Sequence, residues 1–152
     1  MFTSQIIGTG SYIPEVVIPN SDFLHHKFYE REGVPATKTN ESIIEKFSEI
    51  TGITERRYAR PDQNTSDLGA LAAEAAIANA GVDRETLDYI IAAHNFGEVS
   101  PQSNRSNFLP SIGSRIKAKL KIENPDCVAY DVPFGCPGWV EALIHANYFI
   151  RS

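Results

Sequence analysis

The stretch from Cys127 to Val140 constrains the fold more than any other part of the sequence. A short apolar run breaks at Pro133 to Gly135, a cysteine follows at Cys136, and an apolar segment of helical character continues the chain. This order predicts a strand, a tight turn, a thiol and the start of a helix. Because strands and helices alternate along the whole chain, we expect an α/β fold with a mostly parallel, mixed sheet.

Cys136 is the candidate nucleophile of this stretch. Backbone N–H groups in the first turn of a helix lack partners and the helix dipole is positive there, so a thiolate is favoured over a thiol. Pro137 suits the first helical position, where its missing N–H costs nothing. Gly138 would let a substrate or a neighbouring segment approach closely. The alternative is a small buried residue at a helix start, and both interpretations are open.

Apolar periodicity predicts the other elements, together with the N-cap cluster Asn64 to Asp67 and the glycines Gly52 and Gly81, which are placed to end helices. Helical segments are expected over Asn20 to Tyr29, Glu41 to Ile50, Leu68 to Ala80, Asp83 to Leu87 and Ser111 to Lys121, and strands over Ser4 to Thr9 and Tyr89 to Ala93. The second strand is a continuous apolar run, which is typical of burial on both faces. Residues 30–40 and 94–109 lack periodicity and are expected to be loops, and a loop as long as the second is often functional.

Three of the predicted helices carry information about packing. Ile112, Ile116 and Leu120 share one face of their helix, which is expected to cover the sheet. The helix over 68–80 is rich in alanine, which indicates close packing rather than a site. The helix after Pro137 is apolar nearly all round, which is typical of a buried helix.

Composition excludes several classes of protein. The chain has 152 residues, of which 42% are hydrophobic and 22% charged, with a net charge of −5, as expected for one domain with its own core. An acidic balance argues against a nucleic-acid partner. The sequence has neither a long apolar span nor the pattern of a signal peptide, so we expect a cytoplasmic protein that does not enter a membrane. Cys127 and Cys136 form no CxxC pattern, so neither a disulfide framework nor a metal site is expected.

Three local patterns resemble parts of cofactor or catalytic sites. Gly8-Thr9-Gly10 lacks the third glycine of a dinucleotide fingerprint, so no nucleotide cofactor is expected. His25 and His26 are adjacent and share no helical face, which disfavours metal binding. Glu141 and His145 are four residues apart and can meet on one helix face, either as a satisfied interior pair or as an acid–base pair.

The segment around Cys136 resembles the active-site turn of β-ketoacyl-[acyl-carrier-protein] (ACP) synthase III, a family of thiolase-like condensing enzymes in which a cysteine at the head of a buried helix takes up the acyl group. Further matches follow the family's order at Ile7 to Pro14, Asn20 to Asp22, Thr51 to Ile53 with Glu55-Arg56, Ser66 to Gly81, and Asp88 to Ala93. The resemblance implies that residues 1–152 form the amino-terminal half of a five-layer αβαβα sandwich, with the carboxy-terminal half absent from this chain.

The same resemblance implies an acyltransferase with Cys136 as the catalytic residue. The thiol would attack an acyl thioester, from acyl-CoA or acyl-ACP, and a carbanion from malonyl-ACP would then displace the acyl group as 3-oxoacyl-ACP, which initiates fatty acid synthesis. The backbone N–H of Cys136 would be one oxyanion-hole donor. The family's catalytic histidine and asparagine come from the second half, so no residue here is assigned those roles. No cofactor is implied.

The resemblance also suggests partners and substrate contacts. The acyl carrier protein is an expected partner, and a homodimer would form through the strand Cys127 to Val132. Leu109 and Pro110 correspond to the pair that feeds the partner's acyl tunnel, and Gly138 lies beside the nucleophile. Arg56 belongs to a cationic run that either meets a phosphopantetheine or an acidic carrier protein, or is simply solvated.

Two departures from the family's pattern keep other functions open. Lys46 and Ile50 stand where the family has the tryptophan and arginine that hold the adenine of coenzyme A, which predicts an altered adenine clamp. The connection over 94–109 is also longer than in the family. One alternative is therefore a related ketosynthase or acyltransferase of secondary metabolism, making resorcinol-type or polyene products. The other is a non-catalytic dimerisation or carrier-docking subunit of the same fold.

Overall fold

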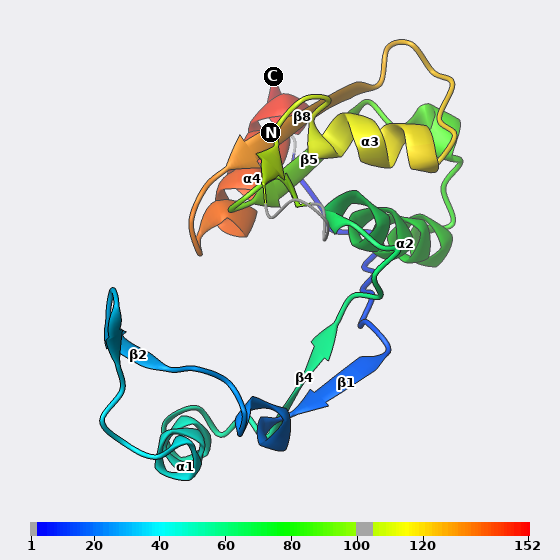
Figure 1. Cartoon of the computed structure of the whole chain (residues 1–152). Helices are drawn as coiled ribbons and strands as arrows, with labels where there is room; N and C mark the ends of the chain where they lie inside the picture. Colours follow the sequence, from blue (N-terminus) through cyan, green and yellow to red (C-terminus); the bar gives the residue numbers. More distant parts are fainter. Residues whose placement is uncertain (1–2, 100–104) are drawn as a thin grey trace. The chain divides into compact units, whose positions relative to one another are not determined.

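The computed structural model describes residues 3–99 and 105–152. The chain divides into two compact units, residues 1–12 with 61–152 and residues 13–60, which we call the larger and the smaller unit. Each unit is described by itself. Figure 1 shows the elements of both units in chain order.

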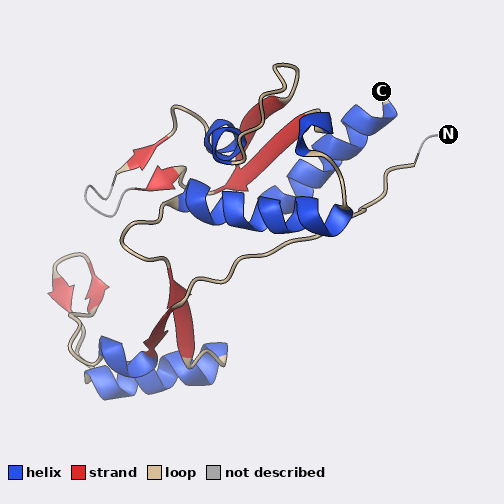
Figure 2. Ribbon diagram, turned by 90° about the vertical axis from the view of Figure 1, so that its right-hand side faces the viewer, coloured by secondary structure: helices blue, strands red, loops and turns tan. Residues whose placement is uncertain are grey.

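A parallel pair of strands forms the centre of the larger unit. Strands β5 (Tyr89–His94) and β8 (Val128–Pro133) align from Tyr89 opposite Val128 to His94 opposite Pro133. Helix α3 (Ile112–Lys119) packs on one face of the pair and helix α4 (Gly138–Arg151) on the other, while α2 (Thr65–Ala80) packs against α3 (Figure 2). This confirms the predicted alternation of parallel strands and covering helices around Cys136.

The core lies between α3 and the strand pair. Its buried apolar residues are Ile112, Ile116, Leu120, Ile122 and Cys127. The first three are the residues whose spacing predicted one apolar face, so that prediction is confirmed. The prediction that β5 is buried on both faces is wrong, because Tyr89 is 42% exposed. Within this chain α4 is likewise not buried on its outer side, where Trp139 and Tyr148 are each 65% exposed.

Helix α2 ends at Ala80 as predicted, but it begins at Thr65, three residues before the predicted start at Leu68. Asn64 and Asp67 form a capping box at its start, and Gly81 ends it with a φ of 67°. Segment 4–9, predicted as a strand, joins no ladder within the described residues. It lies against α2 instead: a Cβ on Gly8 would come within 2.6 Å of the Ala80 Cβ, and one on Gly10 would overlap the Ala72 carbonyl. The glycines and the alanines of α2 thus serve close packing.

The smaller unit consists of two antiparallel strand pairs and a helix. Strand β1 (Val16–Pro19) pairs with β4 (Glu55–Tyr58), and β2 (Tyr29–Arg31) pairs with β3 (Val34–Pro35). Helix α1 (Asn40–Thr51) is capped by the Thr39 side chain and ends at Gly52, which has a φ of 68°. The predicted helix over 41–50 is therefore confirmed.

Two predictions for the smaller unit are wrong. The helix expected from Asn20 to Tyr29 is only the 3-10 turn η1 (Asn20–Phe23), and the loop expected over 30–40 contains the β2–β3 hairpin. Gly33 turns the hairpin with a φ of 75°. Hydrogen bonds from the Thr37 side chain and backbone to the Glu30 carboxylate close it and lower the pKa of Glu30. This pairing of residues seven apart is not visible in apolar periodicity.

The connections around β5 also contain structure. The short turn η2 (Arg84–Thr86) is confirmed where it was predicted. The loop expected over 94–109 contains strands β6 (Glu98–Val99) and β7 (Ser106–Asn107), which pair antiparallel, so that prediction is wrong in its described part. Residues 100–104 of that prediction lie outside the described residues.

Candidate active site

Cys136 lies in the turn between β8 and α4. The helix begins at Gly138 with Pro137 as its N-cap, so Pro137 stands one position earlier than predicted and Cys136 precedes the cap. The Gly138 N–H donates to the Gly135 carbonyl at 2.9 Å, which closes the turn. Cys136 is exposed, so the alternative of a buried structural cysteine is wrong. Cys127 is the buried one.

Contacts with β5 hold this turn in place. The Phe134 N–H donates to the His94 carbonyl at 3.0 Å, which extends the parallel ladder past the end of β8. A Cβ on Gly138 would lie 3.1 Å from the Phe134 Cβ and 3.6 Å from the Ala93 Cβ. Gly138 was predicted to allow close approach of either a substrate or a neighbouring segment, and in the structure neighbouring segments of the chain lie close to it. The first turn of α4 can therefore sit directly on the end of β5.

A groove of about 490 Å³ opens beside Cys136. Side chains of β5 and α4 form the walls of the groove. At one end it is lined by the last residues of β5 and by the turn that carries Cys136. The lining residues are Tyr89, Ile91, Ala93, His94, Asn95, Gly135, Cys136, Gly138, Trp139, Ala142, Leu143 and Ala146. The walls are mainly apolar, and the polar groups His94 and Asn95 come from the end of β5 next to the cysteine turn. Such a groove can hold a short apolar chain next to a thiol.

A buried hydrogen-bond network lies at the end of β5. The Nε2 atom of His94 lies 3.0 Å from Oδ2 of Asp131, and the Gly97 N–H donates to His94 Nδ1 at 2.9 Å. The Asp131 carboxylate also accepts from the N–H groups of Ile112 and Gly113 at 2.8 and 2.7 Å, and so caps α3. The side chains of His94 and Asp131 are only 7% and 9% exposed.

A second buried carboxylate, that of Glu98, lies four residues after His94 in the sequence. Glu98 is 7% exposed, and its two oxygens accept from the backbone N–H and the hydroxyl of Ser66, at 2.8 and 2.6 Å. Thr65 donates from its hydroxyl to the Gly97 carbonyl at 3.1 Å. The segment after β5 is thus attached to the start of α2 as well as to that of α3.

Sequence reasoning missed both carboxylate networks. The available signal was a polar residue within or next to an apolar strand run, Asp131 in β8 and His94 at the end of β5. Such residues are costly to bury without partners. His94 and Asp131 are 37 positions apart along the chain, and the parallel register of β5 and β8 brings them together. Glu98 and Ser66 are 32 positions apart and meet where β6 lies against the start of α2.

Glu141 and His145 meet on α4 as predicted, but half-exposed rather than interior. His145 Nε2 lies 3.4 Å from Glu141 Oε1, and its Nδ1 lies 3.1 Å from the Tyr130 hydroxyl. Burial, with a smaller effect of Tyr89, raises the pKa of Tyr130. Neither Glu141 nor His145 lines the groove beside Cys136. The pair therefore ties α4 to β8.

The other predicted substrate contacts belong to two different units. Leu109 is 81% exposed ahead of α3, and neither it nor Pro110 lines the groove. Arg56 belongs to the smaller unit, where it donates to Asn20 Oδ1 at 2.9 Å and lies 4.9 Å from the Phe23 ring centroid. Arg56 is therefore held in place within its unit rather than simply solvated.

The two positions of the altered adenine clamp also lie in the smaller unit. Lys46 pairs with Glu49 at 2.5 Å, and Ile50 is 73% exposed. Both therefore face solvent on α1 within their unit. The strand predicted as a dimer edge is β8, which pairs with β5 on one side and with no further strand among the described residues.

Within 3–99 and 105–152, no group of three or more His, Cys, Asp or Glu side chains is arranged to hold a metal ion. None of the helices described there combines the length and the apolar character needed to cross a membrane.

Comparison with known proteins gives consistent matches over nearly the whole chain. The chain is 35% identical over 149 residues to β-ketoacyl-[acyl-carrier-protein] synthase III 1 of Vibrio vulnificus, covering 98% of this chain and 40% of that protein. It is 35% identical over 152 residues to β-ketoacyl-[acyl-carrier-protein] synthase III of Clostridium acetobutylicum, covering 100% and 39%. No protein-family model matches the chain.

Solved structures show the same likeness. The crystal structure of 3-oxoacyl-[acyl-carrier-protein] synthase III from Aquifex aeolicus shares 30% identity with a TM-score of 0.71, covering 97% of this chain and 40% of that one. This confirms the predicted fold class, a part of an α/β thiolase-like fold. The chain spans about 40% of the length of the curated relatives it matches.

Proposed function

Because the chain belongs to the β-ketoacyl-ACP synthase III family, whose amino-terminal part it matches, we propose that it takes up an acyl group on Cys136. The observation that carries this proposal is the exposed thiol beside a groove with mainly apolar walls. An acyl chain along β5 and α4 would place its thioester carbonyl near the cysteine turn.

The chemical step is a thiol exchange. The Cys136 thiolate attacks the thioester carbonyl, a new S–C bond forms, and the carrier's thiolate leaves and takes up a proton. The backbone N–H of Cys136 has no hydrogen-bond acceptor within the described part of the chain, which leaves it available to the developing oxyanion. Helix α4 begins two residues after Cys136, and the positive end of its dipole favours the thiolate over the thiol.

The wider roles belong to the same proposal. Residues 1–152 would be the amino-terminal half of a cytoplasmic condensing enzyme, whose other half completes the attack of a malonyl-ACP carbanion and the release of 3-oxoacyl-ACP. Acyl-CoA or acyl-ACP would donate the acyl group, with the carrier protein as partner. The edge of β8 that pairs with no strand of the described residues is a surface on which two copies would pair strand to strand.

Intact mass measurement tests the proposal. The purified chain is incubated with a panel of acyl-CoA and acyl-ACP donors, alongside Cys136→Ala and the matched control Cys127→Ala. We expect one acyl adduct in the wild type and in Cys127→Ala, and none in Cys136→Ala. A folded wild type that gains no mass from any donor would favour the non-catalytic subunit instead. Acylation by donors from secondary metabolism, and by no other donor in the panel, would favour the related ketosynthase or acyltransferase of secondary metabolism.

A further inference from the structure

His94 is a buried titratable residue beside Cys136 that the proposed acyl transfer does not use. Its side chain is 7% exposed, yet it lines the groove at the end of β5. A cysteine, a histidine and an aspartate in one place suggest a nucleophile, a base and an orienting acid. The hydrogen bonds of His94 decide whether this interpretation holds.

Both ring nitrogens of His94 are already engaged. Nδ1 accepts the Gly97 N–H at 2.9 Å, so it carries the lone pair, and this assigns the proton to Nε2, which donates to Asp131 at 3.0 Å. No lone pair is left to take a proton from Cys136. This arrangement suits a residue that holds its neighbours in place.

The backbone of His94 is bonded to the cysteine turn. Its carbonyl accepts the Phe134 N–H at 3.0 Å, two residues before Cys136. Its ring is fixed to Asp131, which is itself held by the start of α3 through Ile112. His94 therefore joins the end of β5 to β8, to α3 and to the turn that carries the thiol.

The segment after His94 is held at its far end as well. Thr65 donates to the Gly97 carbonyl, and Glu98 caps the start of α2 through Ser66. Asn95, between these attachments, lines the groove beside Cys136. The position of this polar part of the groove relative to the thiol thus depends on the bonds that His94 makes.

We propose that His94 is a positioning residue, which holds the end of β5 against the cysteine turn so that a chain bound in the groove is aligned with the Cys136 thiol. This inference rests on the proposed function for its acyl substrate. A displacement of about 1 Å at such a site can cost about a hundredfold in rate. The effect should appear in the rate at saturating thioester rather than in the thiol's intrinsic reactivity.

Three variants separate the bonds of His94. His94→Gln retains a donor toward Asp131, His94→Asn retains an acceptor for the Gly97 N–H, and His94→Ala retains neither. His145→Gln is the matched control, because it removes another hydrogen-bonded histidine of the same unit that does not line the groove. Each variant is assayed for acylation by the hexanoyl thioester of N-acetylcysteamine and for alkylation by iodoacetamide, a small reagent that needs no alignment.

For His94→Ala we expect saturated acylation to fall at least tenfold while the iodoacetamide rate stays within twofold of wild type. The acylation rates of His94→Gln and His94→Asn should lie between those of wild type and His94→Ala. The acylation pH profile of His94→Gln should keep the midpoint of the wild type. The proposal is overturned if acylation in all three variants stays within twofold of wild type, or if alkylation falls in parallel. It is also overturned if His94→Gln loses a limb of the pH profile, because His94 would then be a base.

A second readout does not depend on acyl transfer. The ratio of Cys136 alkylation rates by N-hexylmaleimide and N-methylmaleimide measures how well the groove aligns an apolar tail. We expect a ratio above one in the wild type that falls toward one in His94→Ala. If this occurs while no thioester acylates the wild type, the positioning role stands and the proposed acyl transfer is wrong. If the ratio is unchanged in His94→Ala, the positioning role is wrong.

Discussion

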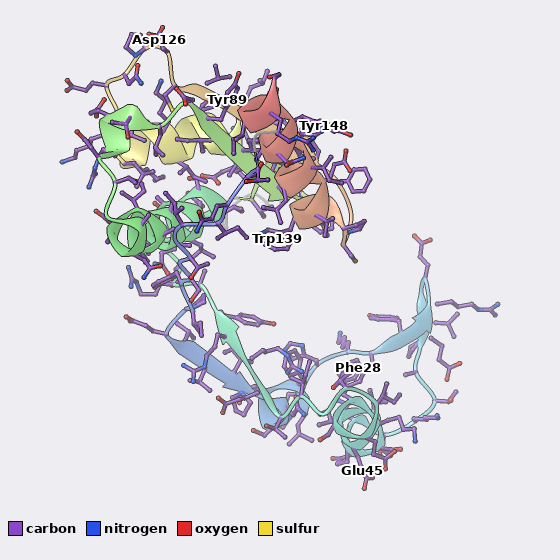
Figure 3. All side chains as sticks on the ribbon, turned by 180° about the vertical axis from the view of Figure 1, so that it is seen from behind. Phe28, Glu45, Tyr89, Asp126, Trp139 and Tyr148 are labelled. Atoms are coloured by element: carbon purple, nitrogen blue, oxygen red, sulfur yellow. The ribbon has the colours of Figure 1, made fainter. Side chains whose placement is uncertain are left out.

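The two helices that pack on the β5–β8 pair differ in how far their apolar side chains are buried. On one face, α3 buries Ile112 and Ile116 to 3% and 7% exposure, and Asp131 caps the helix. On the other, α4 carries Trp139 and Tyr148, each 65% exposed, on its outer side (Figure 3). The same strands supply both faces, because alternate side chains point in opposite directions.

This difference assigns separate tasks to the two faces. The α3 face has buried apolar side chains and satisfied polar groups, so it contributes most to the stability of the larger unit. The α4 face carries the exposed thiol, the groove and a band of exposed apolar side chains, which is typical of a surface that meets another molecule. Four predictions test this division, in order of decreasing effect.

The largest effect is expected from truncating the α3 face. Ile116→Ala should lower the free energy of unfolding by about 2–5 kcal/mol, because it leaves a cavity in a filled core. Leu143→Ala on α4 is the matched control, because Leu143 is already 37% exposed, and should cost less than about 1 kcal/mol. Urea titration measures both, and equal losses would contradict the division between the faces.

Asp131→Asn should rank next. The amide cannot accept from Ile112, Gly113 and His94 together, so at least one buried donor loses its partner, at about 1–3 kcal/mol. Asp126→Asn, on the exposed loop before β8, should change the free energy of unfolding by less than about 0.5 kcal/mol. Thermal unfolding compares the two, and a stable Asp131→Asn would show that the network is not needed to hold α3.

Asp67 should make a smaller, pH-dependent contribution. Burial raises its pKa, but hydrogen bonds from Lys119 and the Asn64 N–H, with the charge of Lys119, outweigh burial and lower it. A lowered folded pKa stabilises the fold above the unfolded value, about 3.9. That stability is lost as the pH falls through the folded pKa. Asp67→Asn should therefore be less stable than wild type at pH 7, and the difference should close at more acidic pH.

Urea titrations at several pH values measure this difference. Asp88→Asn offers a control carboxylate that forms no ion pair within residues 3–99 and 105–152. A gap between wild type and Asp67→Asn that stays constant down to strongly acidic pH would show that charge does not cause it.

The smallest effect on stability is expected on the outer side of α4. Tyr148→Ser should change the free energy of unfolding by no more than about 0.5 kcal/mol, because the side chain is mostly in solvent. Its partner in the comparison is Tyr130→Phe, which removes the hydroxyl bonded to His145 and should cost about 1 kcal/mol. Calorimetry distinguishes them, and a large loss in Tyr148→Ser would place α4 in the stabilising core.

Local patterns predicted those elements whose signals lie within a few residues. The N-cap cluster at Asn64, the helix-ending glycines Gly52 and Gly81, and the apolar face of α3 each act over one or two turns. The candidate cysteine was found in the same way, from a strand, a turn and a helix start. The β2–β3 hairpin was missed because its short strands carry no apolar alternation.

The site divides in the same way between sequence and structure. The sequence by itself determined that a cysteine follows a strand and precedes a helix, because turn residues and caps act locally. Only the tertiary structure decided that Cys136 is exposed beside a groove and that Asp131 meets His94. These facts depend on the parallel register of β5 and β8 and on which side of α4 is covered. Both are set by contacts between residues far apart in the chain.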